Sequence, residues 1–348
     1  MRFSDILYHW YEENRRTLPW RRDKDPYKIW VSEIILQQTR VNQGWNYYLR
    51  FIEKFPDIRS LAGAPMDEIL KVWQGLGYYS RARNMHEAAK TVTEEYGGVF
   101  PRQYEEIKKL KGIGDYTAAA IASIAFDLPY PAVDGNVFRV ISRIFGIHDD
   151  IMLPLTKKKV TAKCGELMEG ISPGIFNEAM MDFGSLQCVP RNPQCNICPF
   201  QNQCYAYRHQ EVDLLPVKIK EVRVSTRYFH YLVYIKEDKT VIRQRDGNDI
   251  WKGLYEFPLI ESGEIHSEKL LTILDHYHHS RIPAWSIRHQ LTHQRIYAFF
   301  YVIPVEIIFP EITDHGFVVD FAKLDQYPFP KIIADFIEKY RRGDPGLT

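Results

Sequence analysis

Four of the five cysteines in this 348-residue chain lie within seventeen consecutive positions. They are Cys188, Cys195, Cys198 and Cys204, with the spacing C-x6-C-x2-C-x5-C. Disulfides are rare inside cells, whereas four thiolates suit either a structural zinc ion or a [4Fe–4S] cluster. Structural zinc usually uses two short C-x2–4-C pairs, and only Cys195 and Cys198 form one here. The spacing therefore favours an iron–sulfur cluster and leaves zinc as the alternative.

The composition is that of a globular protein, with 45% hydrophobic and 26% charged residues and a net charge of +1. The length predicts two domains of ordinary size. No apolar run approaches the ~18–20 residues of a membrane span, and the N-terminus does not resemble a signal peptide. We therefore expect a cytoplasmic protein without a membrane partner. Because the net charge is small, nucleic-acid contacts would have to come from local basic clusters.

The character of the sequence changes after about residue 207. Residues 1–207 show apolar residues at helical spacing, and we find no convincing strand before the cysteines. Residues 208–226 form a charged, proline-containing connector, and residues 227–348 alternate β-branched and aromatic runs with two helical segments. The sequence predicts a multidomain protein, with an all-α part followed by an α+β part.

The stretch LKGIGDYTAAAIA, residues 110–122, predicts a glycine turn that leads into a helix. Exposed amides of Gly112 and Gly114 at a helix N-terminus would form an anion site, and the lysines just before them favour a phosphate. An ordinary turn between packed helices is the alternative. The stretch resembles the helix–hairpin–helix element, which binds a DNA backbone and positions a protein without reading base sequence.

Two carboxylates are candidate functional residues because of the residues around them. Glu33 lies in the apolar segment IWVSEIILQQT, where burying a carboxylate is costly unless it has a partner or a function. Desolvation would raise its pKa and keep a proton available near neutral pH, as a general acid requires. A solvent-facing Glu33 on an amphipathic helix is the alternative. Asp134 precedes Gly135, a pattern that is most often a turn or a helix N-cap.

Seven features together resemble one family: the cysteine spacing and the stretches LPWR, WVSEIILQQTRV, GLGYYSRARN, LKGIGDYTA, VDGNVFRV and FNEAMMDFGS. They are similar to the MutY-type adenine DNA glycosylases of the helix–hairpin–helix superfamily, which includes endonuclease III. The resemblance runs through nearly the whole first two hundred residues. It implies a helical glycosylase domain with a [4Fe–4S] cluster held by the four cysteines, followed by a Nudix-like domain from residue 227.

The resemblance also implies roles for individual residues. Glu33 matches the acid that protonates the adenine ring, Asp134 the carboxylate that stabilises the oxocarbenium-like sugar, and Asn136 a residue that supports this site. The positions around the extruded adenine are Trp20, Arg21 and Glu178. The positions that wedge into the duplex, where taking a base from the stack costs a few kcal/mol, are Gln38, Leu76 and Tyr78.

Tyr116 separates this chain from the bifunctional relatives that also cleave the DNA strand. Those enzymes carry a lysine at this position, and its amine attacks the sugar to form a Schiff base. A phenol cannot form that imine. The resemblance therefore implies a monofunctional glycosylase that leaves an abasic site in base excision repair.

The second domain resembles the Nudix-like module through WKGLYEFP, residues 251–258, but lacks the acidic helix of active Nudix hydrolases. Family members recognise 8-oxoguanine through a Phe-Ser-His loop, and the matching residues here are Leu291, Thr292 and His293. Threonine keeps the hydroxyl, the histidine is retained and the aromatic ring is absent. We expect a monomer that acts on double-stranded DNA containing adenine opposite 8-oxoguanine or guanine.

Two other functions remain as alternatives. An endonuclease III-like glycosylase/lyase would act on oxidised pyrimidines, and Tyr116 and the second domain both argue against it. A non-catalytic protein that only binds damaged DNA would need the hairpin and the cysteines. It would have no use for the pair Glu33 and Asp134.

Overall fold

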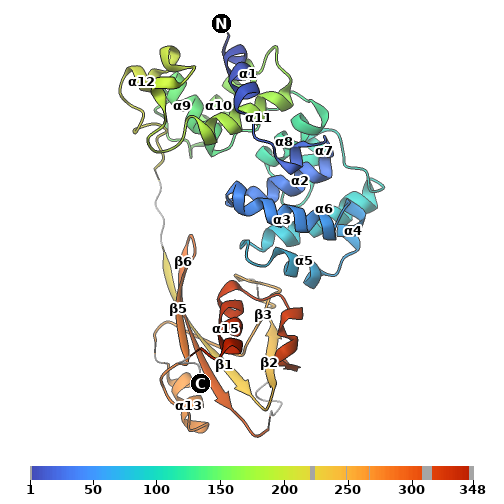
Figure 1. Ribbon diagram of the computed structural model, residues 1–348, viewed down its shortest axis with the longest axis vertical. Helices are drawn as coiled ribbons and strands as arrows, with labels where there is room; N and C mark the ends of the chain where they lie inside the picture. Colours follow the sequence, from blue (N-terminus) through green and yellow to red (C-terminus); the bar gives the residue numbers. More distant parts are fainter. Residues whose placement is uncertain (1, 220–223, 248, 266, 308–315, 345–348) are drawn as a thin grey trace. The chain divides into compact units, whose positions relative to one another are not determined.

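The computed structural model describes residues 2–219, 224–247, 249–265, 267–307 and 316–344. Residues 220–223 of the predicted connector therefore lie outside the described residues. The chain forms two compact units, of residues 1–63 with 84–220 and of residues 64–83 with 221–348. Every strand of the described residues lies in the second unit, so the predicted order of an all-α part and then an α+β part is confirmed (Figure 1).

The helical elements up to the cysteines are short and closely spaced (Figure 1). Their bounds are α1 (Phe3–Asn14), η1 (Pro19–Arg21), α2 (Pro26–Leu36), α3 (Val41–Lys54), α4 (Ile58–Gly63), α5 (Met66–Trp73), α6 (Ser80–Glu95), α7 (Tyr104–Lys109), α8 (Asp115–Phe126), α9 (Gly135–Phe145), α10 (Pro154–Leu167), α11 (Pro173–Leu186), η2 (Cys195–Ile197), η3 (Gln201–Gln203) and α12 (Tyr205–Arg208). No helix of the described residues is both long and apolar enough to span a bilayer.

Helix α2 is a deeply buried part of the candidate site. Its N-terminus is fixed by Pro26 and by the carboxylate of Asp25, which accepts a hydrogen bond of 2.9 Å from the backbone N–H of Tyr27. Every residue of 29–35 is buried, so α2 lies inside the unit. The helical pattern continues in the sequence to Val41, but the helix stops at Leu36 and Gln38 adopts a left-handed backbone with φ of 59°.

A second group of helices forms a core of its own. Helices α1, α9, α10 and α11 share one hydrophobic cluster, in which Trp10 packs edge-on against Phe183 with ring centres 4.9 Å apart. Phe3 stacks on Phe200 at 4.6 Å, which ties α1 to the segment that carries the cysteines. Cys164, the one cysteine outside residues 188–204, is fully buried in this cluster.

The strands form two sheets around the remaining elements. Their bounds are β1 (Ser225–Ile235), β2 (Lys239–Gln244), β3 (Tyr255–Glu256), β4 (Leu259–Ser262), β5 (Trp285–Gln290), β6 (Gln294–Pro304) and β7 (Phe317–Asp320). The other elements are α13 (Glu268–His276), η4 (Phe321–Gln326) and α15 (Lys331–Arg342). One sheet has the order β4-β1-β6-β5 and the other β3-β2-β7.

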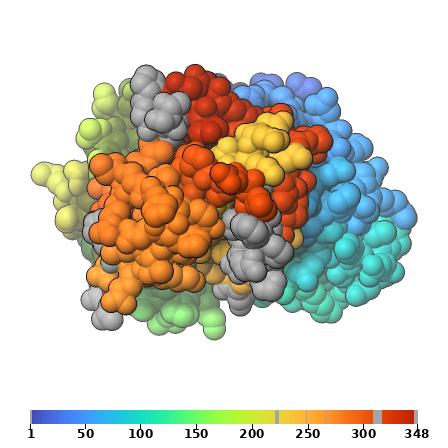
Figure 2. Space-filling view, turned by 90° about the horizontal axis from the view of Figure 1, so that it is seen from below, coloured from blue at the N-terminus to red at the C-terminus, as the bar shows by residue number. Residues whose placement is uncertain are grey.

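Strand β1 is an inner strand of its sheet, and side chains of two hydrophobic cores cover its two faces. Phe229 and Tyr231 belong to the core shared with α15, whereas Leu232 and Tyr234 belong to the core shared with α13. This alternation is the period-2 pattern of a strand between two layers. In Figure 2 the segment around α13, in orange, forms the outward surface over its face of the sheet.

Strands β5 and β6 form an antiparallel hairpin, and its tip is the segment 291–293. The backbone N–H of Leu291 donates to the carbonyl of Gln294 at 2.8 Å and closes the turn. Thr292 and His293 are exposed at this tip. The runs YFHYLVYIKEDKTVIRQR and RIYAFFYVIPVEIIF, rich in β-branched and aromatic residues, correspond to β1 with β2 and to β6, whereas the shorter strands have no such run.

Candidate active site

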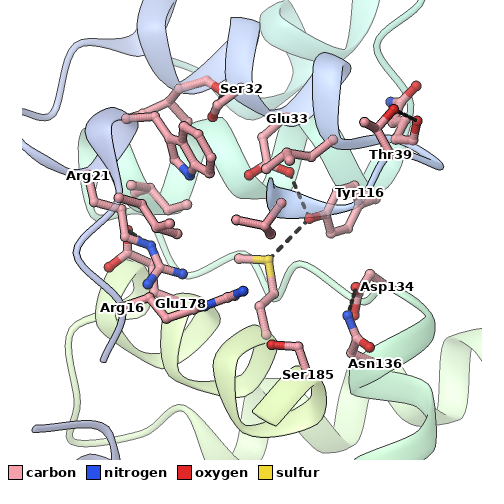
Figure 3. Close-up of a pocket in the computed structure, with 18 of the residues that line it drawn as sticks. Arg16, Arg21, Ser32, Glu33, Thr39, Tyr116, Asp134, Asn136, Glu178 and Ser185 are labelled. Atoms are coloured by element: carbon pink, nitrogen blue, oxygen red, sulfur yellow. Dashed lines mark hydrogen bonds and ion pairs between the residues drawn. The ribbon is translucent and has the colours of Figure 1, made fainter. Parts of the chain in front are cut away.

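Eight predicted site residues line one cavity of about 470 Å³ in the helical unit. Figure 3 shows Glu33 and Tyr116 on one side, Asp134 and Asn136 on another, and Arg21 and Glu178 on a third. The predicted residues that line it are Trp20, Arg21, Glu33, Gln38, Tyr116, Asp134, Asn136 and Glu178. They come from segments far apart in the sequence, so the cavity exists only because α2, α8, α9 and α11 pack together.

The carboxyl group of Glu33 is buried, with only 9% of the residue exposed. Burial raises the pKa of Glu33 to about 7, and the negative charge of Asp134 acts in the same direction. The hydroxyl of Tyr116 donates a hydrogen bond of 2.7 Å to Glu33 Oε2, which opposes the rise. Glu33 can therefore carry a proton near neutral pH, as the sequence predicts for a general acid.

Tyr116 lies at the second position of α8 and points into the cavity. Its Oη is also 3.2 Å from the sulfur of Met181, a weak acceptor. Burial raises the pKa of Tyr116 well above its ordinary value, so the phenol keeps its proton and donates. The side chain at this position is therefore fixed by contacts to two helices.

Asp134 is a helix N-cap, as its sequence pattern predicts, and it also lines the cavity, as the resemblance implies. It is the N-cap of α9, because its Oδ1 accepts the backbone N–H of Val137 at 2.8 Å. Its Oδ2 accepts the side-chain amide of Asn136 at 2.7 Å. Burial raises the pKa of Asp134, while these two hydrogen bonds lower it by favouring the carboxylate. The cap therefore orients a carboxylate toward the cavity.

A second pair of carboxylates lies on α11. Arg21 Nε is 3.3 Å from Glu178 Oε1, and the same guanidinium donates to Asp182 at 2.7 Å and 3.1 Å. Arg16 also donates to Asp182, which has no exposed side-chain surface. Asp182 is therefore fully paired, and Glu178 remains at the cavity wall.

Several residues of this wall were not predicted from the sequence. Met181 and Ser185 line the cavity and Asp182 supports it, and all three follow Glu178 on α11. Positions 178, 181, 182 and 185 repeat at helical spacing, so they occupy one face of the helix. That periodicity was available in the sequence and would have identified them.

Arg139 connects the cavity to the cysteine segment. Its guanidinium donates to Asn136 Oδ1 at 2.9 Å and to the carbonyl of Cys188 at 2.8 Å. One turn further along α9, Arg143 donates to the carbonyls of Val189 at 2.8 Å and Pro190 at 3.1 Å. Helix α9 therefore holds both the carboxylate side of the cavity and the start of the cysteine segment.

Cys188, Cys195, Cys198 and Cys204 line one small cavity beside Phe200, and none of them forms a disulfide. Arg143 Nη1 donates a hydrogen bond of 3.5 Å to Cys188 Sγ. Four soft donors around one cavity fit a [4Fe–4S] cluster in chemistry and number. In the part of the chain that the structure describes, no three His, Cys, Asp or Glu side chains are arranged closely enough to hold a metal ion.

The glycine turn lies between α7 and α8. Gly112 has φ of +77°, and a Cβ there would lie 2.7 Å from Cβ of Asn84, so the turn requires glycine. Gly114 is the N-cap of α8, and a Cβ on it would meet no atom within 4 Å. The first N–H groups of α8 lack intrahelical partners, which suits an anion.

The remaining predicted residues lie in the second unit. Leu76 and Tyr78 of residues 64–83, together with Leu291, Thr292 and His293, line a separate cavity of about 530 Å³. The hydroxyls of Tyr78 and Thr292 are 2.6 Å apart and share a hydrogen bond. Tyr78 is half exposed and adopts φ of 47°, whereas Leu76 is buried.

We expect Glu33→Gln to stabilise the protein in a pH-dependent way. The pKa of Glu33 is about 7 in the folded chain and near 4.5 in an ordinary glutamate. Both states therefore carry the proton below pH 4.5, whereas between these two values the unfolded chain has lost it and folding takes up a proton. Folded stability therefore falls as pH rises through this window, and the variant removes a penalty of roughly 3 kcal/mol.

The measurement is the difference in melting temperature between Glu33→Gln and the parent chain. It should grow from pH 4.5 to about 7 and then stay constant. The exposed Glu87 provides a control, because Glu87→Gln should give no such trend. A difference that does not change with pH would contradict the raised pKa.

Two family models match the chain. Residues 31–169 match the HhH-GPD superfamily of base excision DNA repair proteins, and residues 230–339 match the NUDIX domain. Among solved structures, a thermostable thymine-DNA glycosylase is 32% identical with a TM-score of 0.55, over 60% of this chain and 95% of its own. A trapped endonuclease III–DNA covalent intermediate, 23% identical with a TM-score of 0.52 over 60% and 94%, shares the fold.

Curated relatives extend over more of the chain. An adenine DNA glycosylase of Buchnera aphidicola from Schizaphis graminum is 40% identical over 74% of both chains. Another, from the Baizongia pistaciae strain, is 35% identical over 89% of this chain and 87% of its own. The human adenine DNA glycosylase is 41% identical over 61% of this chain and 41% of its own. The chain therefore belongs to the adenine DNA glycosylases, base excision repair enzymes of the helix–hairpin–helix superfamily.

Proposed function

We propose that this enzyme hydrolyses the N-glycosidic bond of adenine mispaired with 8-oxoguanine or guanine in double-stranded DNA. The observation that carries the mechanism is the presence of two carboxylates of different character in one cavity. Burial raises the pKa of both groups; that of Glu33 reaches about 7, whereas Asp134 accepts two hydrogen bonds that favour its anion. Environments that differ in this way separate an acid from an electrostatic stabiliser.

Glu33 is the general acid in this proposal. Its proton passes to a ring nitrogen of the extruded adenine, which becomes a neutral leaving group as the glycosidic bond breaks. Asp134 remains ionised and stabilises the positive charge that develops on the sugar. Water then attacks the anomeric carbon and gives an abasic site. The proton that Glu33 supplied is replaced when this water is deprotonated.

Tyr116 supports a glycosylase without lyase activity. Its hydroxyl is engaged with Glu33 at 2.7 Å, and a phenol cannot form the imine that strand cleavage requires. Tyr116 therefore holds the acid in place instead of attacking the sugar. This distinguishes the proposal from an endonuclease III-like lyase.

Backbone geometry supports the wedge role of Gln38 and Tyr78. Both have left-handed φ values, 59° and 47°, although neither is glycine. Such conformations cost of order 1–3 kcal/mol and persist where the surroundings impose them, often at ligand-contacting sites. Gln38 lies at the mouth of the adenine cavity and Tyr78 in the cavity of the second unit. Leu76 would have to leave its buried position to enter DNA.

We propose that Leu291, Thr292 and His293 recognise the base opposite adenine. The tip of a hairpin presents Thr292 and His293 to solvent, and Thr292 already contacts Tyr78. A threonine hydroxyl can donate to the carbonyl or accept from the N7–H by which 8-oxoguanine differs from guanine. Gly112 and Gly114 position the duplex through a phosphate and contribute no base preference.

The [4Fe–4S] cluster is assigned to Cys188, Cys195, Cys198 and Cys204 in this proposal. When bound, it would cross-link a segment that otherwise contains only the short helices η2 and η3. We further propose that residues 1–207 form the glycosylase domain, 208–226 the linker and 227–348 the Nudix-like recognition domain of a monomer. The family models at 31–169 and 230–339 support this division.

Glu33→Gln should bind the adenine:8-oxoguanine duplex and release almost no adenine. Loss of a general acid costs about 10²–10⁴-fold in rate, and glutamine keeps the shape and the bond to Tyr116. In the parent enzyme the single-turnover rate should fall as pH rises through about 7, where Glu33 loses its proton. Glu87→Gln is the control. Excision at the parent rate by Glu33→Gln would refute the mechanism.

Borohydride should trap no covalent complex between this enzyme and DNA, because Tyr116 cannot form a Schiff base. The product strand should stay intact until it is treated with alkali. An authentic glycosylase/lyase serves as the positive control for trapping. A borohydride-stable complex would favour the lyase alternative.

Replacing Thr292 and His293 together by alanine should reduce the preference for 8-oxoguanine over guanine. We expect about a tenfold loss of discrimination, the effect of losing one or two polar contacts to a base. The measurement compares single-turnover rates on the two mispairs. Ser286→Ala, on the exposed face of β5, is the matched control. Unchanged discrimination would argue against the assigned loop.

The purified protein should contain iron and absorb at about 400 nm, as thiolate-bound iron does. Cys198→Ser should lose both signals, whereas Cys164→Ala, at a buried core position, should keep them. Stoichiometric zinc in a colourless protein would replace the cluster assignment by a zinc site.

A further inference from the structure

Tyr11 is a buried tyrosine of α1 whose hydroxyl contacts Glu178, a residue that lines the adenine cavity. Only 4% of the residue is exposed, and its Oη donates a hydrogen bond of 2.8 Å to Glu178 Oε2. It lies outside the stretch 31–169 that matches the glycosylase family model. Burial raises the pKa of Tyr11 above its ordinary value, so the phenol stays protonated and remains a donor.

The two oxygens of Glu178 are held by different groups. Oε1 lies 3.3 Å from Arg21 Nε, and Oε2 accepts the shorter bond from Tyr11. Arg21 is itself anchored by its other two nitrogens, which donate to Asp182. The guanidinium therefore has little freedom to follow Glu178, and the direction of the carboxylate depends on the hydroxyl of Tyr11.

The chemistry of Glu178 suits one purine edge. The oxygens of a carboxylate accept hydrogen bonds, and the exocyclic amine is the donor that distinguishes adenine from purines with a carbonyl at that position. Guanine or hypoxanthine would present a carbonyl oxygen to the carboxylate, so two acceptors would face each other with no donor between them. The orientation of Glu178 therefore bears on base selection as well as on binding.

We propose that Tyr11 is a positioning residue for base selection, which holds the Glu178 carboxylate in the direction that accepts the exocyclic amine of adenine. The inference rests on the proposed function, since it assigns Glu178 to the extruded base. It adds a residue from α1, through the packing of α1 on α11, to the recognition of adenine.

The test compares Tyr11→Phe with the parent on two duplexes. One carries adenine opposite 8-oxoguanine, and the other carries purine, which lacks the exocyclic amine, at the same position. Removing a hydrogen bond to a charged group should lower the single-turnover rate on adenine about tenfold. The rate on purine should not change. Tyr8→Phe, on the same helix and 38% exposed, is the matched control and should leave both rates unchanged.

Glu178→Gln provides a second readout. If Tyr11 acts through Glu178, adding Tyr11→Phe to Glu178→Gln should cause no further loss on adenine. Equal losses on adenine and purine, additive losses in the double variant, or no loss at all would each overturn the proposal. A parent enzyme that removes adenine but shows no preference for it over purine would also overturn it. A parent enzyme without excision activity would instead refute the proposed function, and the Tyr11 proposal with it.

Discussion

The burial of one carboxyl group, that of Glu33, organises the helical unit around the cavity. Helix α2 is apolar on nearly every side, so its residues 29–35 lie inside the unit and carry Glu33 with them. A buried carboxyl group needs a hydrogen-bond partner, and α8 supplies Tyr116 at 2.7 Å. Packing that excludes water from Glu33 also raises its pKa to about 7. The cost of this burial and the availability of the proton have the same physical origin.

Helix α9 relates the cavity to the cysteine segment. Its N-cap is Asp134, and the next turns carry Arg139 and Arg143, whose guanidinium groups donate to backbone carbonyls from Gly184 to Pro190. Three consecutive turns of one helix therefore have three tasks. They orient a carboxylate, support Asn136 and hold the backbone that begins the cysteine segment. A substitution in α9 that shifts its axis would affect all three together.

Local chemistry made part of this structure predictable from the sequence. Glu33 stood out because a carboxylate in an apolar segment is costly, and the glycine turn because Gly112 requires a left-handed backbone. Other features depend on tertiary packing. The bond between Tyr11 and Glu178 joins positions 167 residues apart, so no local pattern reports it. Strands β3 and β7 were missed because two and four residues are too few to show a clear alternation.

The register of β1 has a further consequence for the hairpin of β5 and β6, whose tip is the segment 291–293. β1 pairs with β6 in parallel over eleven residues, from Ser225 with Gln294 to Ile235 with Pro304, and both faces of its buried part, residues 229–234, are covered. Amide protons of such a strand exchange with solvent only when the whole unit opens. The tip that carries Thr292 directly precedes β6, and its His293 carbonyl accepts the backbone N–H of Ser225 at 3.0 Å, at the exposed start of β1. In the proposed function, the tip is therefore open to a base, while the buried pairing of β1 and β6 behind it fixes its position.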